Sequence, residues 1–192
     1  MRERWMHSLQ STGQLAASAP TVVLLHGVAV SHRYFVPTAK VLAGFCRVFV
    51  PDLPGFGLSE SPRRILDVPE LSETLVEWMD AVGIGRADLI GNSVGCQLAV
   101  EVALRHPVRV RRVVLQGPTV DPRARSMVRQ FGRWLTNGVL EPFSLYPIVL
   151  RDFIDAGVRR SLVTFRYVVR DRIDISCREW WRRHSSCAAA GT

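Results

Sequence analysis

The stretch ADLIGNSVGCQLAVEVALRHP, residues 87–107, decides the fold. It opens with a short apolar run of strand length and continues as a longer run of helical length that ends before Pro107. Between the two lie Gly91, Ser93 and Gly95, in the pattern Gly-x-Ser-x-Gly. A tight turn from strand to helix forces its central residue into a strained backbone conformation, and glycine two positions away on each side avoids collisions. The pattern therefore predicts that Ser93 lies on a sharp strand-to-helix turn.

Ser93 is the candidate nucleophile of this turn. The helix that starts behind it directs its N-terminal amides toward developing negative charge, which makes the backbone N–H of Val94 a natural donor to an oxyanion. The alternative is a glycine-rich turn with an incidental serine, and the flanking strand and helix disfavour it. Cys96 lies nearby, but one turn into the helix, where we expect it to be buried in packing.

Apolar runs of strand length alternate with helical patterns along the first 120 residues. This alternation predicts a parallel sheet with crossover helices, and one short antiparallel strand is expected around residues 5–9. The expected strands are 21–26, 46–50, 87–91 and 111–116, and the expected helices are 36–44, 69–82 and 94–106. Asp67 and Pro69 open the second of these helices. From residue 122 to about 169 the chain looks helical, with aromatic residues interleaved with arginines. These aromatics are expected to face a core, although in a lid they can also line a pocket.

Composition excludes several classes of protein. The 192 residues are 47% hydrophobic and 22% charged, which is typical of one globular domain. The net charge is +8, but the basic residues are scattered, so we expect no nucleic-acid partner. No run reaches the roughly 18 apolar residues of a membrane helix. The four cysteines lack metal-ligand spacing and no cleaved signal is evident, so we expect a reducing, cytoplasmic setting and no metal.

Three motifs occur in the order typical of a known family. They are VVLLHG at 22–27, VFVPDLPGFGLSE at 48–60 and GNSVG at 91–95. Over residues 20–175 the chain resembles the α/β-hydrolase family. The resemblance implies an α/β fold, a mostly parallel sheet with flanking helices and a helical cap, here lacking the last two strands. It implies that the N–H of Val28 is a second oxyanion donor, and that His26 is structural and holds the loop by hydrogen bonds. The core would span 1–120, the cap 121–175, and an aberrant, disordered tail 176–192.

The resemblance also implies an activity. A complete member with these motifs would attack an ester, thioester, amide or activated carbon–carbon bond through Ser93, without a metal or organic cofactor. The expected partner is a small molecule, an apolar ester or acyl compound. A different class of function is a non-catalytic binding or interaction module that keeps the pocket. An acyltransferase or a cofactor-free haloperoxidase on the same scaffold is a third possibility.

The acid and the histidine of a catalytic triad are missing from their usual places. In the family the order is Ser, then Asp or Glu, then His, after strands that this sequence does not show. His106 lies at the end of a helix, where it suits the helix dipole, and His184 lies in a tail with no strand before it. Asp121 is the best acid candidate, against a turn or capping role. Without a base the chain is expected to be inactive or nearly so.

The tail SCREWWRRHSSCAAAGT, residues 176–192, departs from the family pattern. If the tail is read one nucleotide earlier, the first base of each present codon becomes the second base of a new codon. Cysteine and tryptophan codons begin with T, and every codon with T in second place encodes an apolar residue. The two cysteine and two tryptophan codons of the tail therefore give four apolar residues in the shifted frame. Arginine dominates over the single lysine, Lys40, which fits a GC-rich gene. With such codons the shifted tail can read LPRVVAPTFVVRGGRD, a linker, strand and acid-bearing turn. We interpret the tail as a shifted reading frame; a natural truncated paralogue and an unusual C-terminus are the alternatives.

Overall fold

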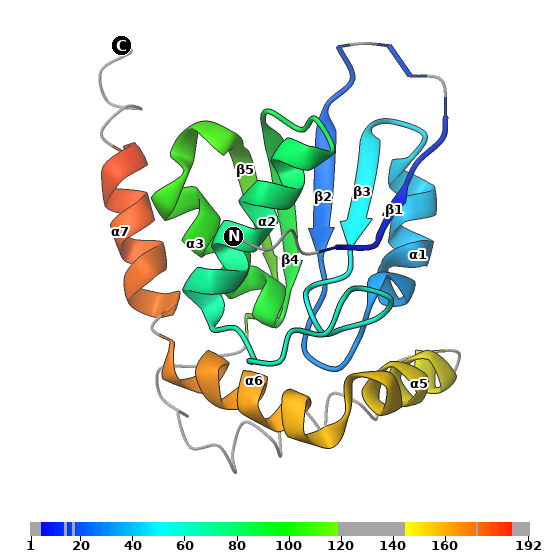
Figure 1. The fold of residues 1–192 in the computed structure, drawn as a ribbon. Coiled ribbons are helices and arrows are strands. Elements are labelled where there is room, and N and C mark those ends of the chain that lie inside the picture. Colours follow the sequence, from blue (N-terminus) through cyan, green and yellow to red (C-terminus); the bar gives the residue numbers. More distant parts are fainter. Residues whose placement is uncertain (1–4, 14, 17, 119–144, 172, 186–192) are drawn as a thin grey trace.

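A computed structural model describes residues 5–13, 15–16, 18–118, 145–171 and 173–185. Its centre is a five-stranded sheet with the order β1-β3-β2-β4-β5 (Figure 1). β1 pairs antiparallel with β3, and the other neighbours are parallel. The strands are β1 Ser8–Gln10, β2 Thr21–Leu25, β3 Arg47–Pro51, β4 Ala87–Asn92 and β5 Val110–Gln116. The predicted α/β class, the parallel sheet and the antiparallel first strand are therefore confirmed.

Helices cover both faces of this sheet. Because successive side chains of a strand point to opposite faces, a strand covered on both sides reads as a continuous apolar run. Val22 and Leu24 of β2 face one side and pack with α1, whereas Val23 and Leu25 face the core formed with α2 and α3. The helices are α1 His32–Leu42, α2 Val68–Ala81 and α3 Val94–Arg105, and the short 3₁₀ turn η1 covers Pro107–Arg109.

The helices begin where capping side chains place them. Asp67 and Glu70 form a reciprocal capping box, in which each side chain accepts a hydrogen bond from the other residue's backbone N–H at 3.0 Å. This confirms the helix start predicted at Asp67. α1 begins earlier than the expected residue 36, because Ser31 caps it and accepts a hydrogen bond from the N–H of Arg33.

Two further helices lie across the carboxyl ends of the parallel strands. They are α5 Tyr146–Ala156 and α6 Val158–Arg170, drawn in yellow and orange in Figure 1. Ligands of open α/β sheets bind outside the carboxyl ends of the strands, so this placement suits a cap over a site. Of the predicted cap, residues 121–144 lie outside the described part of the chain.

The tail expected to be disordered, residues 176–192, is in part helical. Residues 176–185 belong to helix α7, Ile173–Ser185, which runs beside α3 (Figure 1). Its apolar side chains explain the order, because Ile173 is buried with Cys96 and Cys177 packs against them, while Trp180 packs partly against the main core. Residues 186–192 lie outside the described part of the chain.

β5 is an edge strand of the sheet that the structure describes. Two of its apolar residues are exposed, Val114 at 51% and Leu115 at 36%. An exposed apolar edge strand carries unpaired N–H and C=O groups and is a template for pairing with another chain.

We therefore predict that the protein self-associates through this edge. Val114→Lys should shift the sedimentation-velocity distribution toward the monomer, because a charged side chain opposes edge-to-edge pairing. Val108→Lys is the control, since Val108 is 76% exposed but lies in the turn before the strand. An unchanged distribution in Val114→Lys would show that the edge does not mediate association.

Candidate functional site

Ser93 occupies the turn between β4 and α3. Its backbone angles are φ 55° and ψ −116°, a conformation that a non-glycine residue adopts at a cost of roughly 1–3 kcal/mol. Its N–H donates a hydrogen bond to the carbonyl of Gln116 on β5 at 3.1 Å, which anchors the turn to the sheet. Strain of this kind persists only where the surrounding structure enforces it, and it gathers at functional sites.

The two glycines of the turn are sterically required. A Cβ on Gly91 would overlap the backbone of Gly95 and Cys96, and a Cβ on Gly95 would overlap the carbonyl of Leu25 on β2. The start of helix α3 therefore packs directly against the backbone of both β4 and β2. A side chain at Gly91 or Gly95 would force the helix away from these strands. The strand-to-helix turn predicted from the sequence has the expected geometry.

A loop from β2 lies against Ser93. A Cβ on Gly27 would come within 3.2 Å of Ser93 Cβ and of Asn92 Oδ1, so the backbone of this loop approaches the serine closely. Val28 follows, partly buried against the core, and Ala29 has a positive φ of 59°. Backbone N–H groups near a helix N-terminus can stabilise negative charge that develops on a bound group.

His26 holds this loop by two hydrogen bonds. Its Nδ1 donates to the carbonyl of Gly27 at 2.8 Å, and its Nε2 accepts from the N–H of Leu53 at 2.9 Å. These bonds correspond to the neutral tautomer with the proton on Nδ1. Burial lowers the pKa of the fully buried ring, although the bond to Gly27 opposes this. The hydrogen bonds that the family resemblance implied for His26 are present.

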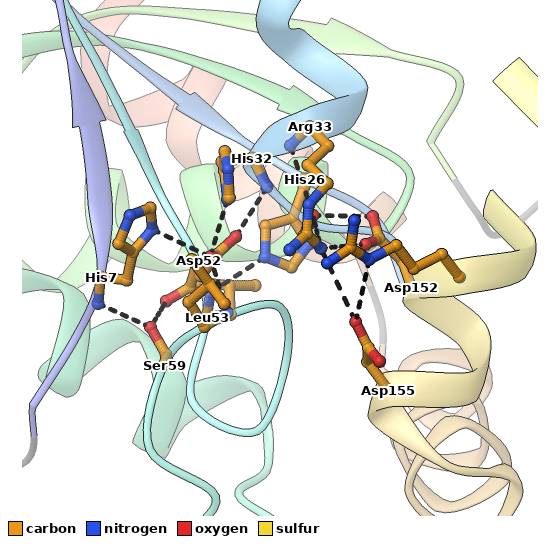
Figure 2. Close-up of polar contacts among 12 residues, drawn as sticks. His7, His26, His32, Arg33, Asp52, Leu53, Ser59, Asp152 and Asp155 are labelled. Atoms are coloured by element: carbon orange, nitrogen blue, oxygen red, sulfur yellow. Dashed lines mark hydrogen bonds and ion pairs between the residues drawn. The ribbon is translucent and has the colours of Figure 1, made fainter. Parts of the chain in front are cut away.

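Asp52 is the centre of a second polar network, which Figure 2 shows beside His26. Its Oδ1 accepts from the N–H of His32 at 2.6 Å. Its Oδ2 accepts from the rings of His32 at 2.8 Å and His7 at 3.1 Å, and from the N–H of Leu58 at 3.0 Å. The carboxylate therefore joins His7, just before β1, the start of α1 and the loop after β3. Sequence reasoning did not single out this network, although Asp52 lies inside the quoted motif.

The surroundings of Asp52 favour its charged form. Burial alone would raise the pKa of its carboxyl, but hydrogen bonds from the His32 ring and from the N–H groups of Leu58 and His32 outweigh burial and lower the pKa to about 2. Ligand atoms of His7, His32 and this carboxylate lie within 4.8 Å of one another, which is close enough for metal ligands. The Nδ1 atoms of both rings already bond to the carboxylate at hydrogen-bond distances.

The other sequence-predicted residues lie as follows. The turn brings Ser93 and Val94 together with the loop of Val28, as described above. Cys96 is buried, and burial raises the pKa of its thiol to about 11, which suits packing better than nucleophilic chemistry. His106 bonds to Glu73 at 3.1 Å. Asp121 and the side chain of His184 lie outside the described part of the chain.

Comparison with known proteins agrees with the observed fold. The family model described as the alpha/beta hydrolase fold matches residues 20–183. The chain belongs to the α/β-hydrolase family. Five strands of the family sheet are described here, and no described helix is long and apolar enough to cross a membrane.

The relatives of this α/β hydrolase include several hydrolases. It is 46% identical over 72 residues to 2-hydroxymuconate semialdehyde hydrolase of Pseudomonas putida, matching 37% of this chain and 26% of that one. It is 37% identical over 102 residues to a pimeloyl-[acyl-carrier protein] methyl ester esterase of Nitrosospira multiformis, matching 52% of this chain and 39% of that one. The matches span less than half the length of either relative.

Solved structures extend the likeness of fold over most of the chain. The enol-lactonase of Burkholderia xenovorans LB400 superposes with a TM-score of 0.64 at 24% identity, covering 88% of this chain and 71% of that one. At this identity the likeness supports the fold alone.

The steric reading of the turn gives a first prediction for the site. Gly95→Ala should abolish soluble expression or lower the free energy of unfolding by about 3 kcal/mol or more, because the new methyl group collides with the backbone of β2. Urea denaturation measures the loss. Gly85→Ala is the matched control, since nothing lies within 4 Å of a Cβ there. Near-native stability of Gly95→Ala would contradict the close approach of α3 and β2.

The Asp52 network gives a second prediction, on pH. Because folding lowers the pKa of Asp52 from 3.8 to about 2, its charged form adds about 2 kcal/mol to the free energy of unfolding above pH 4. This contribution should be lost as the pH falls from about 4 through about 2. Asp52→Asn should flatten this part of the acid limb in urea denaturation between pH 2 and pH 5. Glu77→Gln controls for removing an exposed carboxylate, and an acid limb unchanged in Asp52→Asn would contradict the assignment.

Proposed function

We propose that Ser93 is the nucleophile of a serine hydrolase site that acts on a small-molecule substrate, an apolar ester or related acyl or carbon–carbon bond. The backbone geometry of Ser93 carries the proposal, because a strained serine at the start of a helix, between two sterically required glycines, is the arrangement that presents a nucleophile. The hydrolase and esterase names of the relatives support the reaction class.

In this mechanism Ser93 Oγ attacks the carbonyl carbon of an ester. The N–H groups of Val28 and Val94 stabilise the negative charge on the carbonyl oxygen. When the bond to the leaving alcohol breaks, an acyl group remains on Ser93, and the serine proton leaves with the alcohol by way of a base. Water then cleaves the acyl group and restores the serine.

The described histidine rings have partners other than Ser93. The rings of His7 and His32 bond to Asp52, that of His26 bonds to Gly27 and Leu53, and that of His106 bonds to Glu73. All four described histidine rings are therefore engaged elsewhere. We propose that the 192-residue chain turns over slowly or not at all, with residual rate from the oxyanion donors alone.

The engagement of the described histidine rings with other groups favours a second candidate function. A protein that keeps the pocket without a free base could bind a ligand without transforming it, as a binding or interaction module. The two candidates differ in whether Ser93 can be acylated when a base is supplied from solution.

Imidazole added to the protein tests the difference. With a p-nitrophenyl ester, imidazole should accelerate acylation of Ser93 by tenfold or more, because it replaces the missing proton acceptor. Intact-mass spectrometry detects the acyl group, which should be absent from Ser93→Ala and present in Ser61→Ala, a control at an exposed serine. A protein unlabelled with or without imidazole would support the binding module. Fast turnover without imidazole, lost in Ser93→Ala, would support the nucleophile and overturn the proposed impairment.

A further inference from the structure

A buried carboxylate of the cap reaches the core close to the candidate site. Asp152 of α5 is 1% exposed, and its Oδ2 accepts a hydrogen bond from Ser31 Oγ at 2.7 Å. Its Oδ1 accepts from Arg33 Nη1 at 2.6 Å. Figure 2 shows this contact beside His26, with Asp155 one turn away on the same helix. Ser31 itself is fully buried and caps α1.

Ser31 is also the last residue of the loop that lies against Ser93. The loop runs from Gly27 to Ser31, and its backbone approaches Ser93 so closely that a Cβ on Gly27 would lie 3.2 Å from Ser93 Cβ. Inside it, Ala29 is buried and has a positive φ of 59°, which an L-residue adopts only under external restraint. The start of the loop is restrained by the bond of His26 to Gly27, and its end by the bond of Ser31 to Asp152.

We propose that Asp152 is a positioning residue, which holds the 27–31 loop in its strained form through Ser31 and Arg33. Docking of helix α5 against the core is thereby coupled to the placement of the Val28 N–H. The inference rests on the proposed function, because Val28 matters only if Ser93 reacts. A carboxylate suits this role, since one group can accept from the serine hydroxyl and pair with the guanidinium at once.

The competing explanation is that Asp152 merely attaches the cap to the core. In that case its loss would loosen α5 and leave the loop unchanged. Asp155 provides the matched control, because it lies on the same helix, is 42% exposed and reaches Arg33 only at 3.8 Å. Removing it perturbs the helix and the charge without breaking the bond to Ser31.

Hydrogen–deuterium exchange separates the two explanations. In Asp152→Ala the backbone amides of residues 27–31 should exchange at least tenfold faster, whereas Asp155→Ala should leave them as in the wild type. Amides of α2 report on global unfolding. Should Asp152→Ala unfold, Ser31→Ala breaks the same bond from the other side and should also accelerate exchange in the loop. Faster exchange in α5 with an unchanged loop would overturn the proposal.

Imidazole-assisted acylation of Ser93 then tests the link to the site. In Asp152→Ala the maximal rate of acylation should fall about tenfold. The ester concentration that gives half the maximal rate should change little, because the loop stabilises the reacting ester and does not bind the free ester. Asp152→Asn keeps an acceptor for Ser31 and should recover part of the rate. A wild-type rate in Asp152→Ala, despite faster loop exchange, would overturn the coupling. If wild-type Ser93 is never acylated, the proposed function fails, while faster loop exchange still supports the restraint by Asp152.

Discussion

The close crossing of α3 with β4 and β2 is the constraint on which the rest of the site depends. Gly91 and Gly95 lack the Cβ atoms that would collide with the backbone where the helix crosses the two strands. The chain can then turn from strand to helix within one residue, and Ser93 absorbs the strain with a positive φ. Packing of the sheet therefore fixes the serine at the helix N-terminus.

Buried hydrogen bonds carry this rigidity from the sheet to the loops. His26 ties the loop after β2 to Leu53 in the loop after β3, and Asp52 ties the latter to His32 at the start of α1 and to His7 before β1. Each of these polar groups has its partners within the protein, so their burial rigidifies the loops without leaving an unsatisfied group. Such preorganisation is what allows backbone N–H groups to stabilise a developing charge.

The sequence predicted the elements whose signals are local. Apolar runs covered on both faces gave the strands, Asp67 gave the start of α2, and the two glycines gave the turn at Ser93. The long-range polar contacts could not be predicted, because Ser31 and Asp152 are 121 residues apart and no spacing rule joins them. Helix α7 was missed for a similar reason, since its order comes from packing against α3.

In our proposal the cap contributes to the candidate site as well as covering it. Hydrogen bonds attach its described helices to the core. Asp152 bonds to Ser31 at 2.7 Å and to Arg33 at 2.6 Å, Gln97 to the carbonyl of Val168 at 2.8 Å, and Arg160 to the carbonyl of Pro62 at 3.1 Å. Ser31 ends the loop that contains Val28, and Gln97 lies one turn along the helix that begins at Val94. Both proposed oxyanion donors thus belong to segments that are bonded to the cap through buried side chains. A buried polar group that loses its hydrogen-bond partner costs free energy, so a shift of the cap would disturb the segments of both donors together.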